Sequence, residues 1–413
     1  MKKILFLAIF FLTSAYIGYE NPFLIDEPKK YIKFYLKKLN FVKNFANDKE
    51  DIKTIENEKY DVKNVNKLIV EGNSFNLVLN KRINFDGRTA GFFIKNFENE
   101  KIKFDIFLQN GVNIQNKLTR EIFLPSNISF KQNGGVKSVF EVGDKQFALV
   151  SNKTTNCPHA SIYDIETQNI ILKTKCLPDI DNVDFNGLGG AVVEKDNYIF
   201  ISIGAPEWDS NKISSLAQKK DYLYGKVLKI KKDFFLGPSN EEPIIDIFTY
   251  GHKNPQGLTI SKELFFSIEH GPQGGDEINL IDENKNYGWP QVSYGTEYNN
   301  GKSYVRYDEK FQKPLFTFLP SVAPASLNIC PDNLKKYYSK DICLMFLTLR
   351  DMSLYIVLIN EEKLNVISYE KFKIGERLRH FGLKNNQLFI KKNTFFISAD
   401  GAGIFSAQFD NFR

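Results

Sequence analysis

The sequence predicts an all-β protein built as a six-bladed β-propeller, and two observations lead to that prediction. From Lys67 onward, short runs rich in Val, Ile, Phe and Tyr alternate with turn signals such as Asn-Gly, Asp-Gly and Gly-Asp, and helical periodicity is scarce. The runs recur as pairs in units of about 40 to 50 residues, a repeat length typical of propeller blades. About six such units fit between Lys67 and Arg413. Two packed sheets in a β-sandwich are the alternative at this point.

The clearest strand signals are mostly apolar runs of three to six residues, which indicate buried strands. In chain order they are residues 147–150, 198–203, 226–230, 264–268, 342–347, 354–359, 388–390 and 403–407.

Composition excludes several classes of protein. The chain has 413 residues, of which 42% are apolar and 25% charged, and these fractions argue against disorder, a collagen-like fibre and a polytopic membrane protein. The 55 Lys and Arg residues exceed the 49 Asp and Glu residues by only six. Such a small excess does not suggest a nucleic acid as the main partner.

The first twenty residues have the anatomy of a secretory signal. Two lysines precede an apolar stretch from Ile4 to about Leu12. The stretch is shorter than the roughly 20 residues that span a bilayer comfortably. Because no clean A-x-A cleavage site follows, an uncleaved anchor is the alternative to a signal peptide over residues 1–20. Either interpretation predicts export, to the periplasm or the extracellular space.

Residues 21–66 form an expected N-terminal extension before the propeller domain of residues 67–413. The extension is rich in Lys, Asn and Glu, and the spacing from Tyr31 to Phe41 is compatible with an amphipathic helix. Such a helix is expected to act as a tether or to lie on the body, and its basic, aromatic face suits contact with anionic lipid.

The four cysteines form two pairs that are local in sequence. Cys157 and Cys176 make the first pair, and Cys330 and Cys343 the second. Export permits disulfides, so we expect each pair to be bonded, while four buried thiols are the alternative. The absence of a C-x-x-C motif disfavours a zinc ribbon or a thioredoxin-like site.

The most informative motifs lie in residues 250–258, 269–280 and 286–290. Gly and Pro after a strand create an irregular turn whose carbonyl oxygens can point outward, and calcium binds carbonyl and carboxylate oxygens. Asp276 and Glu277 add negative charge next to that turn. On these residues alone, a plain turn with solvated carboxylates is the simpler interpretation.

These segments closely resemble the quinoprotein glucose and sorbosone dehydrogenase family, soluble pyrroloquinoline quinone (PQQ) enzymes built on a six-bladed β-propeller. The resemblance follows the family's order over roughly residues 130–410. Its further matches are Gln132–Gly135, Leu223–Ile230, Leu319–Pro324, Leu349–Arg350 and Glu376–Arg379.

The resemblance implies two calcium sites. The backbone oxygens of Gly271 and Pro272 would hold the calcium that also contacts PQQ. Glu277 and Tyr287 would belong to a second, structural calcium, with Asp276 beside them.

The resemblance also implies a set of residues that contact PQQ. Lys253 and Asn254 fall where the family has Arg-Asn at the quinone, and Arg350 falls where it has a cofactor-contacting Lys. Arg377 and Arg379 match the family's pair of arginines. PQQ carries three carboxylates, which guanidinium groups bind in a bidentate manner, and these positions take three of only eight arginines in the chain. A salt-bridge ladder at alternate strand positions is the alternative for Arg377 and Arg379.

The sequence departs from the family at the catalytic base. The family's histidine falls at Asn186 or Gly187, where no imidazole is present, and neither residue can act as a base. Asp184 is a carboxylate nearby, but a shift of two residues is large for proton transfer. The resemblance places Gln132 and His270 on the substrate side of the site.

The other histidines have less specific expectations. His252 is expected to line the central face, His159 to lie in a loop without an identified partner, and His380 to pack within the last blade.

The motifs and the family resemblance suggest three functions. The first is an exported, PQQ- and calcium-dependent dehydrogenase that oxidises an aldose sugar at C1 and passes electrons to an acceptor that the sequence does not name. The second is a catalytically degenerate propeller that binds a sugar or a partner protein. The third is a calcium-dependent lactonase, but the sequence shows no ring of carboxylate and Asn ligands that would support a central catalytic metal. The chain contains no G-x-S-x-G, H-E-x-x-H or P-loop motif, which argues against hydrolases of those types and nucleotide enzymes.

Overall fold

The computed structural model describes most of the chain after residue 65. The chain divides into two units, residues 1–59 and 60–413. The expected signal or anchor of residues 1–20 and the extension up to residue 65 lie outside the described residues. The described residues are 66–98, 101–115, 118–121, 128–154, 156–207, 210–237, 244–410 and 412.

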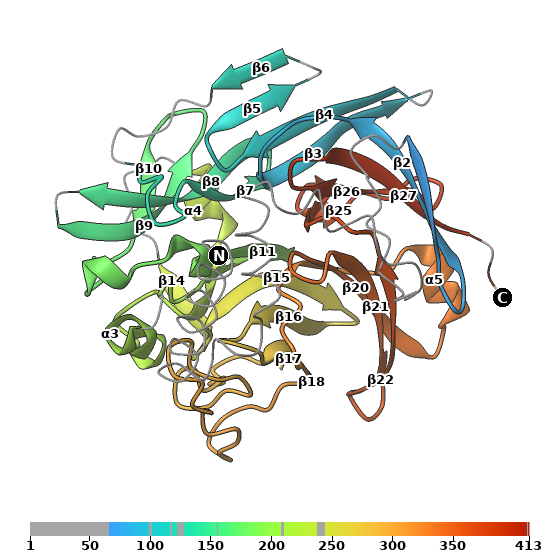
Figure 1. Ribbon diagram of the computed structural model, residues 1–413. Helices are drawn as coiled ribbons and strands as arrows, with labels where there is room; N and C mark the ends of the chain where they lie inside the picture. The colour runs from blue at the N-terminus through green and yellow to red at the C-terminus, as the bar shows by residue number, and fades with distance from the viewer. Residues whose placement is uncertain are drawn as a thin grey trace, which may run out of the picture. The chain divides into compact units, whose positions relative to one another are not determined.

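Six antiparallel sheets form the six blades of the propeller (Figure 1). The first blade contains β3 (Thr89–Glu98), β4 (Lys101–Leu108), β5 (Val112–Gln115) and β6 (Leu118–Glu121), with β24 (Leu383–Lys384) and β25 (Gln387–Leu388) added at its inner edge. The second contains β7 (Val136–Val142), β8 (Lys145–Thr154), β9 (Cys157–Asp164) and β10 (Ile170–Lys173). The third contains β11 (Gly189–Lys195), β12 (Tyr198–Ile203), β13 (Lys226–Lys231) and β14 (Ile245–Tyr250).

The remaining blades complete the ring. The fourth contains β15 (Asn254–Ser261), β16 (Leu264–His270), β17 (Asp276–Ile281) and β18 (Phe316–Phe318). The fifth contains β19 (Pro324–Ile329), β20 (Asp341–Thr348), β21 (Ser353–Asn360) and β22 (Asn365–Lys373). The sixth contains β23 (Leu378–Phe381), β26 (Phe395–Ala399), β27 (Gly403–Asp410), β2 (Asn76–Ile83) and β1 (Lys67–Glu71).

Short helices occupy the connections between strands. The α-helices are α3 (Asn211–Ser214), α4 (Lys232–Leu236) and α5 (Asp332–Tyr337). The 3₁₀ helices are η3 (Ile180–Asn182), η4 (Phe185–Gly187) and η5 (Ser215–Gln218). No helix among the described residues is long and apolar enough to cross a membrane.

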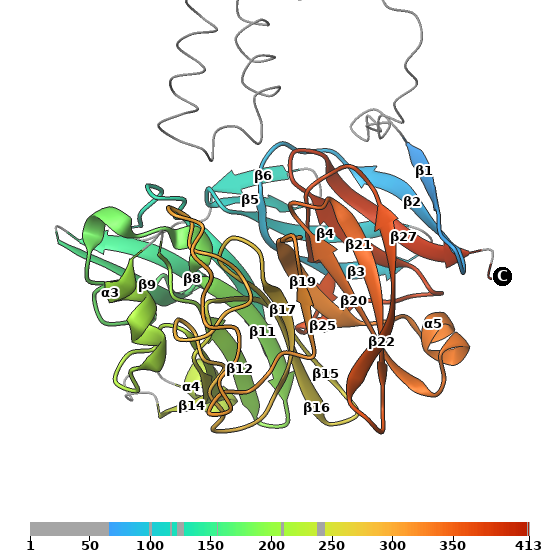
Figure 2. The ribbon, with the colours of Figure 1, turned by 60° about the horizontal axis from the view of Figure 1, so that its bottom comes forward.

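The ring is closed by pairing the two ends of the propeller sequence. β2 pairs antiparallel with β27, so that Leu79 lies opposite Ala407, and Figure 2 shows these strands side by side. The innermost strands β3, β7, β11, β15, β19 and β23 are neighbours around the axis. The pairing of β2 with β27 joins the N-terminal strands to the last blade and so closes the ring.

The core consists of apolar layers between adjacent blades. Phe75, which precedes β2, is fully buried and stacks on Phe372 of β22 with ring centroids 5.5 Å apart. Phe409 of β27 contacts both rings, at 5.2 and 5.7 Å. Large aromatic side chains thus fill the space where these strands pack together.

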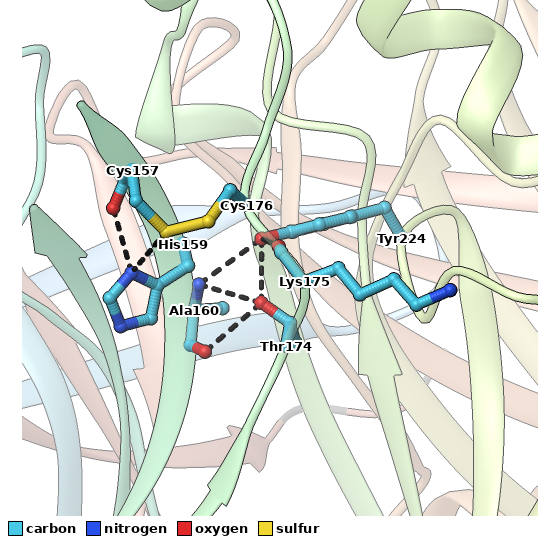
Figure 3. Close-up of a disulfide and its surroundings, with 7 residues drawn as sticks. All are labelled: Cys157, His159, Ala160, Thr174, Lys175, Cys176 and Tyr224. Carbon is cyan, nitrogen blue, oxygen red and sulfur yellow. Dashed lines mark hydrogen bonds between the residues drawn. A yellow bond between two sulfur atoms is a disulfide. The ribbon is translucent and has the colours of Figure 1, made fainter.

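Both expected disulfides are present. Cys157 at the start of β9 is bonded to Cys176 after β10, and Cys330 after β19 is bonded to Cys343 of β20. Figure 3 shows the first bond beside Tyr224, whose hydroxyl lies 2.6 Å from that of Thr174. The prediction of two sequence-local pairs is therefore confirmed.

The predicted strand pattern is confirmed as well, and the β-sandwich alternative is wrong. Seven of the eight expected runs fall within strands, while the run at 388–390 contributes only its first residue, to β25. The expectation for His159 is wrong, because this residue lies in β9 rather than in a loop. It is fully buried, and its Nδ1 is 2.8 Å from the carbonyl oxygen of Cys157. Its neighbours Cys157 and Pro158 suggested a loop, but pairing with β8 extends the strand through them.

Candidate active site at the propeller axis

A polar cavity of about 260 Å³ lies at the end of the axis where the innermost strands begin. Every inner strand contributes a lining residue at or next to its first position. These residues are Thr89, Lys137, Gly189, Asn254, Ala323 and Arg379. A second cavity of about 310 Å³ is lined by later residues of the same strands, and Gln256 and His380 line both. The first residues of the six inner strands meet at one end of the axis because these strands, although distant in sequence, all run in the same direction along it.

Positive side chains dominate one part of the lining. Arg88, Lys137, Lys253, Arg377 and Arg379 all line the cavity. Burial acts to lower the pKa of Lys253, but nearby acidic groups, Tyr298 and Glu207 foremost, raise it above its usual value. Burial and the charge of Arg379 lower the pKa of Arg377. A cavity with this excess of cations suits a ligand with several carboxylates.

The two arginines of the last blade share an acidic partner. Arg379 binds Asp400 in a bidentate manner, with Nε–Oδ1 and Nη2–Oδ2 distances of 2.7 and 2.5 Å. Arg377 Nε lies 3.6 Å from Asp400 Oδ2. One carboxylate thus orients two guanidinium groups, one of which, Arg377, is about half exposed and keeps most of its donors for a ligand.

The segment with the missing histidine forms another wall of the cavity. Asp184 caps η4 by accepting a hydrogen bond from the backbone N–H of Asn186 (3.0 Å), and Asp184, Asn186 and Gly187 line the cavity. Asn254 holds this segment in place, since its Oδ1 accepts from the N–H of Gly189 (3.0 Å) and its Nδ2 donates to the carbonyl of Asn186 (3.3 Å). Asn254 is therefore a brace between blades three and four as well as a lining residue.

The Gly-Pro turn of blade four presents backbone oxygens. Within the described chain, no hydrogen bond outside the strands ends on the carbonyl oxygen of Gly271 or Pro272. A Cβ on Gly271 would lie 2.2 Å from the carbonyl oxygen of Gly275 and 2.4 Å from that of Gly274, so only glycine fits there. Free carbonyl oxygens in a tight turn are suitable ligands for calcium, and the residues at this turn therefore fit the metal.

Asp276 holds this turn in place through hydrogen bonds. Its Oδ1 accepts from the N–H of Gly271 and the hydroxyl of Ser321, both at 3.0 Å. Its Oδ2 accepts from the N–H groups of Val322 (2.8 Å) and Ala323 (2.7 Å). With four donors satisfied and 1% of its surface exposed, Asp276 joins the turn to the loop before β19 rather than presenting a free carboxylate.

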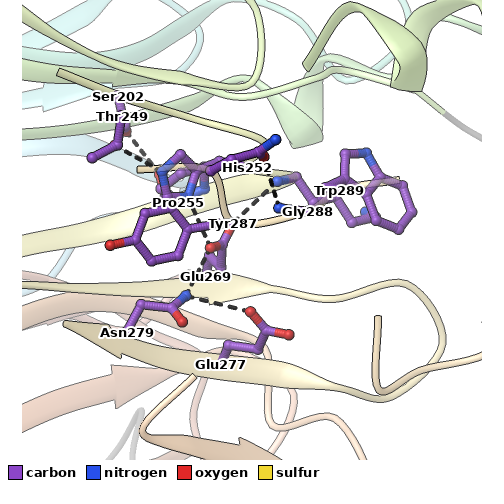
Figure 4. A network of polar contacts seen from close by, with 12 residues as sticks. Ser202, Thr249, His252, Pro255, Glu269, Glu277, Asn279, Tyr287, Gly288 and Trp289 are labelled. Atoms are coloured by element: carbon purple, nitrogen blue, oxygen red, sulfur yellow. Dashed lines mark hydrogen bonds and ion pairs between the residues drawn. The ribbon is translucent and has the colours of Figure 1, made fainter. Parts of the chain in front are cut away.

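A buried network lies behind the turn (Figure 4). The carboxylate of Glu269 accepts from the backbone N–H of Lys253 at 3.0 Å and from Nδ2 of Asn279 at 2.9 Å, and its Oε1 is 3.0 Å from Nδ1 of His252. The other ring nitrogen of His252 is 2.8 Å from the hydroxyl of Thr249. With both ring nitrogens engaged and its side chain fully buried, His252 positions the strands and does not face the cavity.

The expected second calcium ligands lie beside this network. Glu277 is opposite Glu269 on paired strands, and burial together with that carboxylate raises the pKa of Glu277 well above its ordinary value. Two buried carboxylates at paired positions of neighbouring strands repel each other when both are ionised, unless a proton or a cation lies between them. Gly271, Glu277 and Tyr287 line one small cavity of about 20 Å³, which has room for a single water-sized species.

The hydroxyl group of Tyr287 is used elsewhere. It donates to the carbonyl of Leu280 (2.7 Å) and accepts from the N–H of Asp282 (3.0 Å), while the ring stacks on His252 at 4.6 Å. Only backbone atoms of Tyr287 therefore remain as candidate ligands. Among the described residues, no three His, Cys, Asp or Glu side chains are grouped so as to hold a metal ion.

The structure brings some predicted residues to the cavity and leaves others outside it. The predicted residues in the lining are Asn186, Gly187, Lys253, Asn254, His270, Arg377 and Arg379. Arg350 is exposed and outside the lining, to which its neighbour Leu349 contributes. Gln132 is also outside the lining, and its side-chain amide donates to the carbonyl of Ile180 (2.7 Å).

Sequence reasoning missed Glu207 and Tyr298 in the lining, and it missed three further titratable residues that lie near the starts of inner strands. Arg88 and Lys137 line the cavity although neither belongs to a motif that was singled out, and His380 lies at the junction of both cavities rather than packing only within its blade. Burial and Arg379 lower the pKa of His380 to about 4. The available signal was positional, because each of the three stands at or beside the start of an inner strand.

This protein is a six-bladed propeller with a cation-rich cavity on its axis and a Gly-Pro turn beside it. These features are those of a propeller that binds a cofactor or another small ligand. Comparison with known proteins identifies the family. The family model for glucose/sorbosone dehydrogenases matches residues 166–392, more than half of the chain. The chain belongs to this family.

Curated relatives match over part of their length. An aldose sugar dehydrogenase of Escherichia coli is 30% identical over 207 residues, which cover 47% of this chain and 53% of the relative. Quinoprotein glucose dehydrogenase B of Acinetobacter calcoaceticus is 38% identical over 102 residues, which cover 23% of this chain and 21% of the relative. The matched segments thus span between about a fifth and about half of these relatives.

Solved structures share the fold over most of the described chain. The soluble aldose sugar dehydrogenase of Escherichia coli in its apo form has a TM-score of 0.62 at 19% identity, covering 82% of this chain and all of the other. A PQQ-bound aldose sugar dehydrogenase of Streptomyces coelicolor has a TM-score of 0.56 at 16% identity, covering 81% of this chain and 98% of the other. At these identities the similarity shows the propeller fold alone.

Proposed function

We propose that this protein is an exported dehydrogenase that depends on PQQ and calcium and oxidises an aldose sugar at C1. The observation that carries the proposal is the convergence of Lys253, Arg377 and Arg379 on one axial cavity beside the Gly271–Pro272 turn. PQQ is a tricarboxylate, and guanidinium and ammonium groups are suited to hold it. When bound, PQQ would supply a two-electron acceptor for hydride from the sugar.

Calcium would be held by the carbonyl oxygens of Gly271 and Pro272, where it adds positive charge next to the quinone. Asp276 would keep those oxygens in position through its bond to the N–H of Gly271. Glu277, with the backbone of Tyr287, would contribute to a second calcium that offsets the repulsion between Glu277 and Glu269.

The substrate side of the cavity would include His270, whereas Gln132, the other residue expected there, lies outside the lining. Nε2 of His270 is 2.6 Å from the carbonyl oxygen of Pro324, which can only accept, so this nitrogen carries the hydrogen. The ring is thereby fixed beside the calcium turn, where it can orient a sugar hydroxyl. We expect electrons to leave for an external acceptor.

Two features support export. The disulfides Cys157–Cys176 and Cys330–Cys343 persist best in an oxidising compartment such as the periplasm or the extracellular space. Residues 1–20 would act as a signal peptide or as a membrane anchor, which would also tether the propeller to the membrane.

The proposal is tested by titrating the purified protein with PQQ in the presence of calcium or of a chelator, and by recording the cofactor's absorption. We expect calcium-dependent binding, followed by spectral reduction of the cofactor when an aldose is added. Arg377→Gln should weaken PQQ binding about 10-fold or more through loss of a charged hydrogen bond, while Arg306→Gln, at an arginine outside the axial cavity, serves as the matched control. Absence of binding at excess PQQ would refute the proposal.

A second candidate function is a non-catalytic propeller that binds a sugar or a partner protein. The missing imidazole at Gly187 favours it, and so does the bidentate engagement of Arg379 by Asp400. Calorimetric titration with aldoses, with and without PQQ, separates the two. Sugar binding that is independent of PQQ and unaccompanied by cofactor reduction would support this second function.

A further inference from the structure

The cavity wall at Asp184–Gly187 has no histidine, but another candidate base lies next to it. We infer that Lys137, at the start of the innermost strand β7, takes the proton of the sugar's C1 hydroxyl in place of the family's histidine. This inference rests on the proposed dehydrogenase function and names a catalytic residue for it.

A short chain of polar contacts joins Lys137 to the segment without a histidine. The Nζ atom of Lys137 is 3.0 Å from the carbonyl oxygen of Asn133. Asn133 in turn donates through Nδ2 to Oδ1 of Asp184 (3.0 Å), the same oxygen that accepts from the N–H of Asn186 (3.0 Å). The amine is therefore held at the border of the gap, although about fifty residues separate Lys137 from Gly187 in the sequence.

The alternatives in the lining are less suitable. His270 adjoins the proposed calcium turn, and its Nε2–H is committed to Pro324. His380 lies deeper, where the two axial cavities meet, and with a pKa of about 4 it is a weak base. Asp184 already accepts hydrogen bonds from Asn133 and Asn186. Lys137 donates one hydrogen bond, to the carbonyl oxygen of Asn133, and lines the same cavity.

The surroundings of Lys137 favour its neutral form. Burial and the charges of Arg379 and Arg88 outweigh the opposite effect of Asp184 and lower the pKa of the Lys137 amine to about 7. The remaining charged or titratable groups of the lining are Glu207, Lys253, His270, Tyr298, Arg377 and His380. A base with a pKa near the working pH combines availability with proton affinity, and lysine shifts readily when buried among cations.

The step balances without a further reagent. The neutral amine accepts the hydroxyl proton and becomes an ammonium, so one N–H bond forms as the O–H bond breaks. The electron pair left on the oxygen would form the C1=O bond of a lactone. The hydrogen at C1 would leave as hydride, with the electron pair of the broken C1–H bond, and the quinone of the proposed function would be its acceptor.

Two measurements test the inference. The first is made on the apo-protein after reductive methylation with ¹³C-formaldehyde, and follows the pH dependence of the dimethyl-lysine signals. The Lys137 signal is identified by its absence from the Lys137→Arg variant. We expect it to titrate near pH 7.

The second measurement compares Lys137→Arg, Lys137→Gln and the control Lys131→Arg. We expect Lys137→Arg to bind PQQ within about threefold of the wild type, because a guanidinium group at this position is compatible with a tricarboxylate ligand. The kcat should fall about 10²- to 10³-fold and lose its rise through neutral pH, because a guanidinium group does not give up its proton. Lys131→Arg should match the wild type. A Lys137 amine that titrates above pH 9, an Arg variant that keeps its kcat, or an effect confined to PQQ affinity would each overturn the inference. A wild-type protein that binds PQQ but oxidises no aldose would refute the proposed function itself, and the inference with it.

Discussion

Asp276 connects the proposed calcium turn to the next blade, and its removal gives the sharpest test of this structural account. In Asp276→Ala, the backbone N–H groups of Gly271, Val322 and Ala323 lose their acceptor inside the protein. The hydroxyl of Ser321 loses one as well, but a hydroxyl can rotate toward another partner.

The size of the effect follows from these contacts. A buried donor without a partner costs about 1–3 kcal/mol, so three backbone donors give a loss of about 4 kcal/mol in the free energy of unfolding. Asp276→Asn keeps one acceptor oxygen but turns an NH₂ group toward other donors, and we expect a loss of about 2 kcal/mol.

The measurement is guanidinium-induced unfolding, followed by the fluorescence of the buried Trp289 under non-reducing conditions. Asp246→Asn, an exposed carboxylate on β14, is the control and should change stability by less than about 0.5 kcal/mol. If Asp276→Ala lost less than about 1 kcal/mol, the turn would not depend on this carboxylate and the reasoning would be wrong.

Three further predictions concern buried polar groups and a disulfide. Lys226 is fully buried, and its Nζ donates to the carbonyls of Leu216 (3.0 Å), Ala217 (2.8 Å) and Tyr224 (2.7 Å). Lys226→Met leaves these carbonyls without that donor, so it should lower the free energy of unfolding by about 2–4 kcal/mol, as measured by denaturant titration. Replacing both Cys330 and Cys343 by Ser should cost about 3 kcal/mol, seen as a lower unfolding midpoint. The pKa of His380 is lowered to about 4, so the unfolded chain binds its proton more readily, and the stability due to the neutral histidine is lost as pH falls from about 6.5 to 4. His380→Gln should flatten that part of the stability–pH curve.

Each of these predictions has an outcome that contradicts it. A Lys226→Met variant as stable as the wild type would show that the three carbonyls find other donors. If the double Ser variant had the same midpoint as the oxidised wild type under non-reducing conditions, that disulfide would not have the stabilising role given to it. Equal slopes between pH 6.5 and 4 for wild type and His380→Gln would mean that other groups control the acid response.

Much of the fold was predictable because its signals are local. Alternating apolar runs and turn residues mark strands such as Tyr198–Ile203 and Ser353–Asn360 wherever the blade lies in the ring. The two disulfides were predictable for the same reason, since each joins cysteines fewer than twenty residues apart. His159 escaped this reasoning because strand pairing with β8 overrode the preference of Cys157-Pro158 for a loop.

The candidate site was predictable only where a motif marks it. The sequence by itself determined the Gly271–Pro272 turn, the resemblance that points to Arg377 and Arg379, and the absence of a histidine at Gly187. The tertiary structure decided that Arg350 stays exposed outside the cavity and that Lys137 lies beside the Asp184–Gly187 segment. The physical reason is ring closure: pairing of β2 with β27 aligns the starts of six sequence-distant strands around one axis, and a local pattern contains no information about which of those starts will meet.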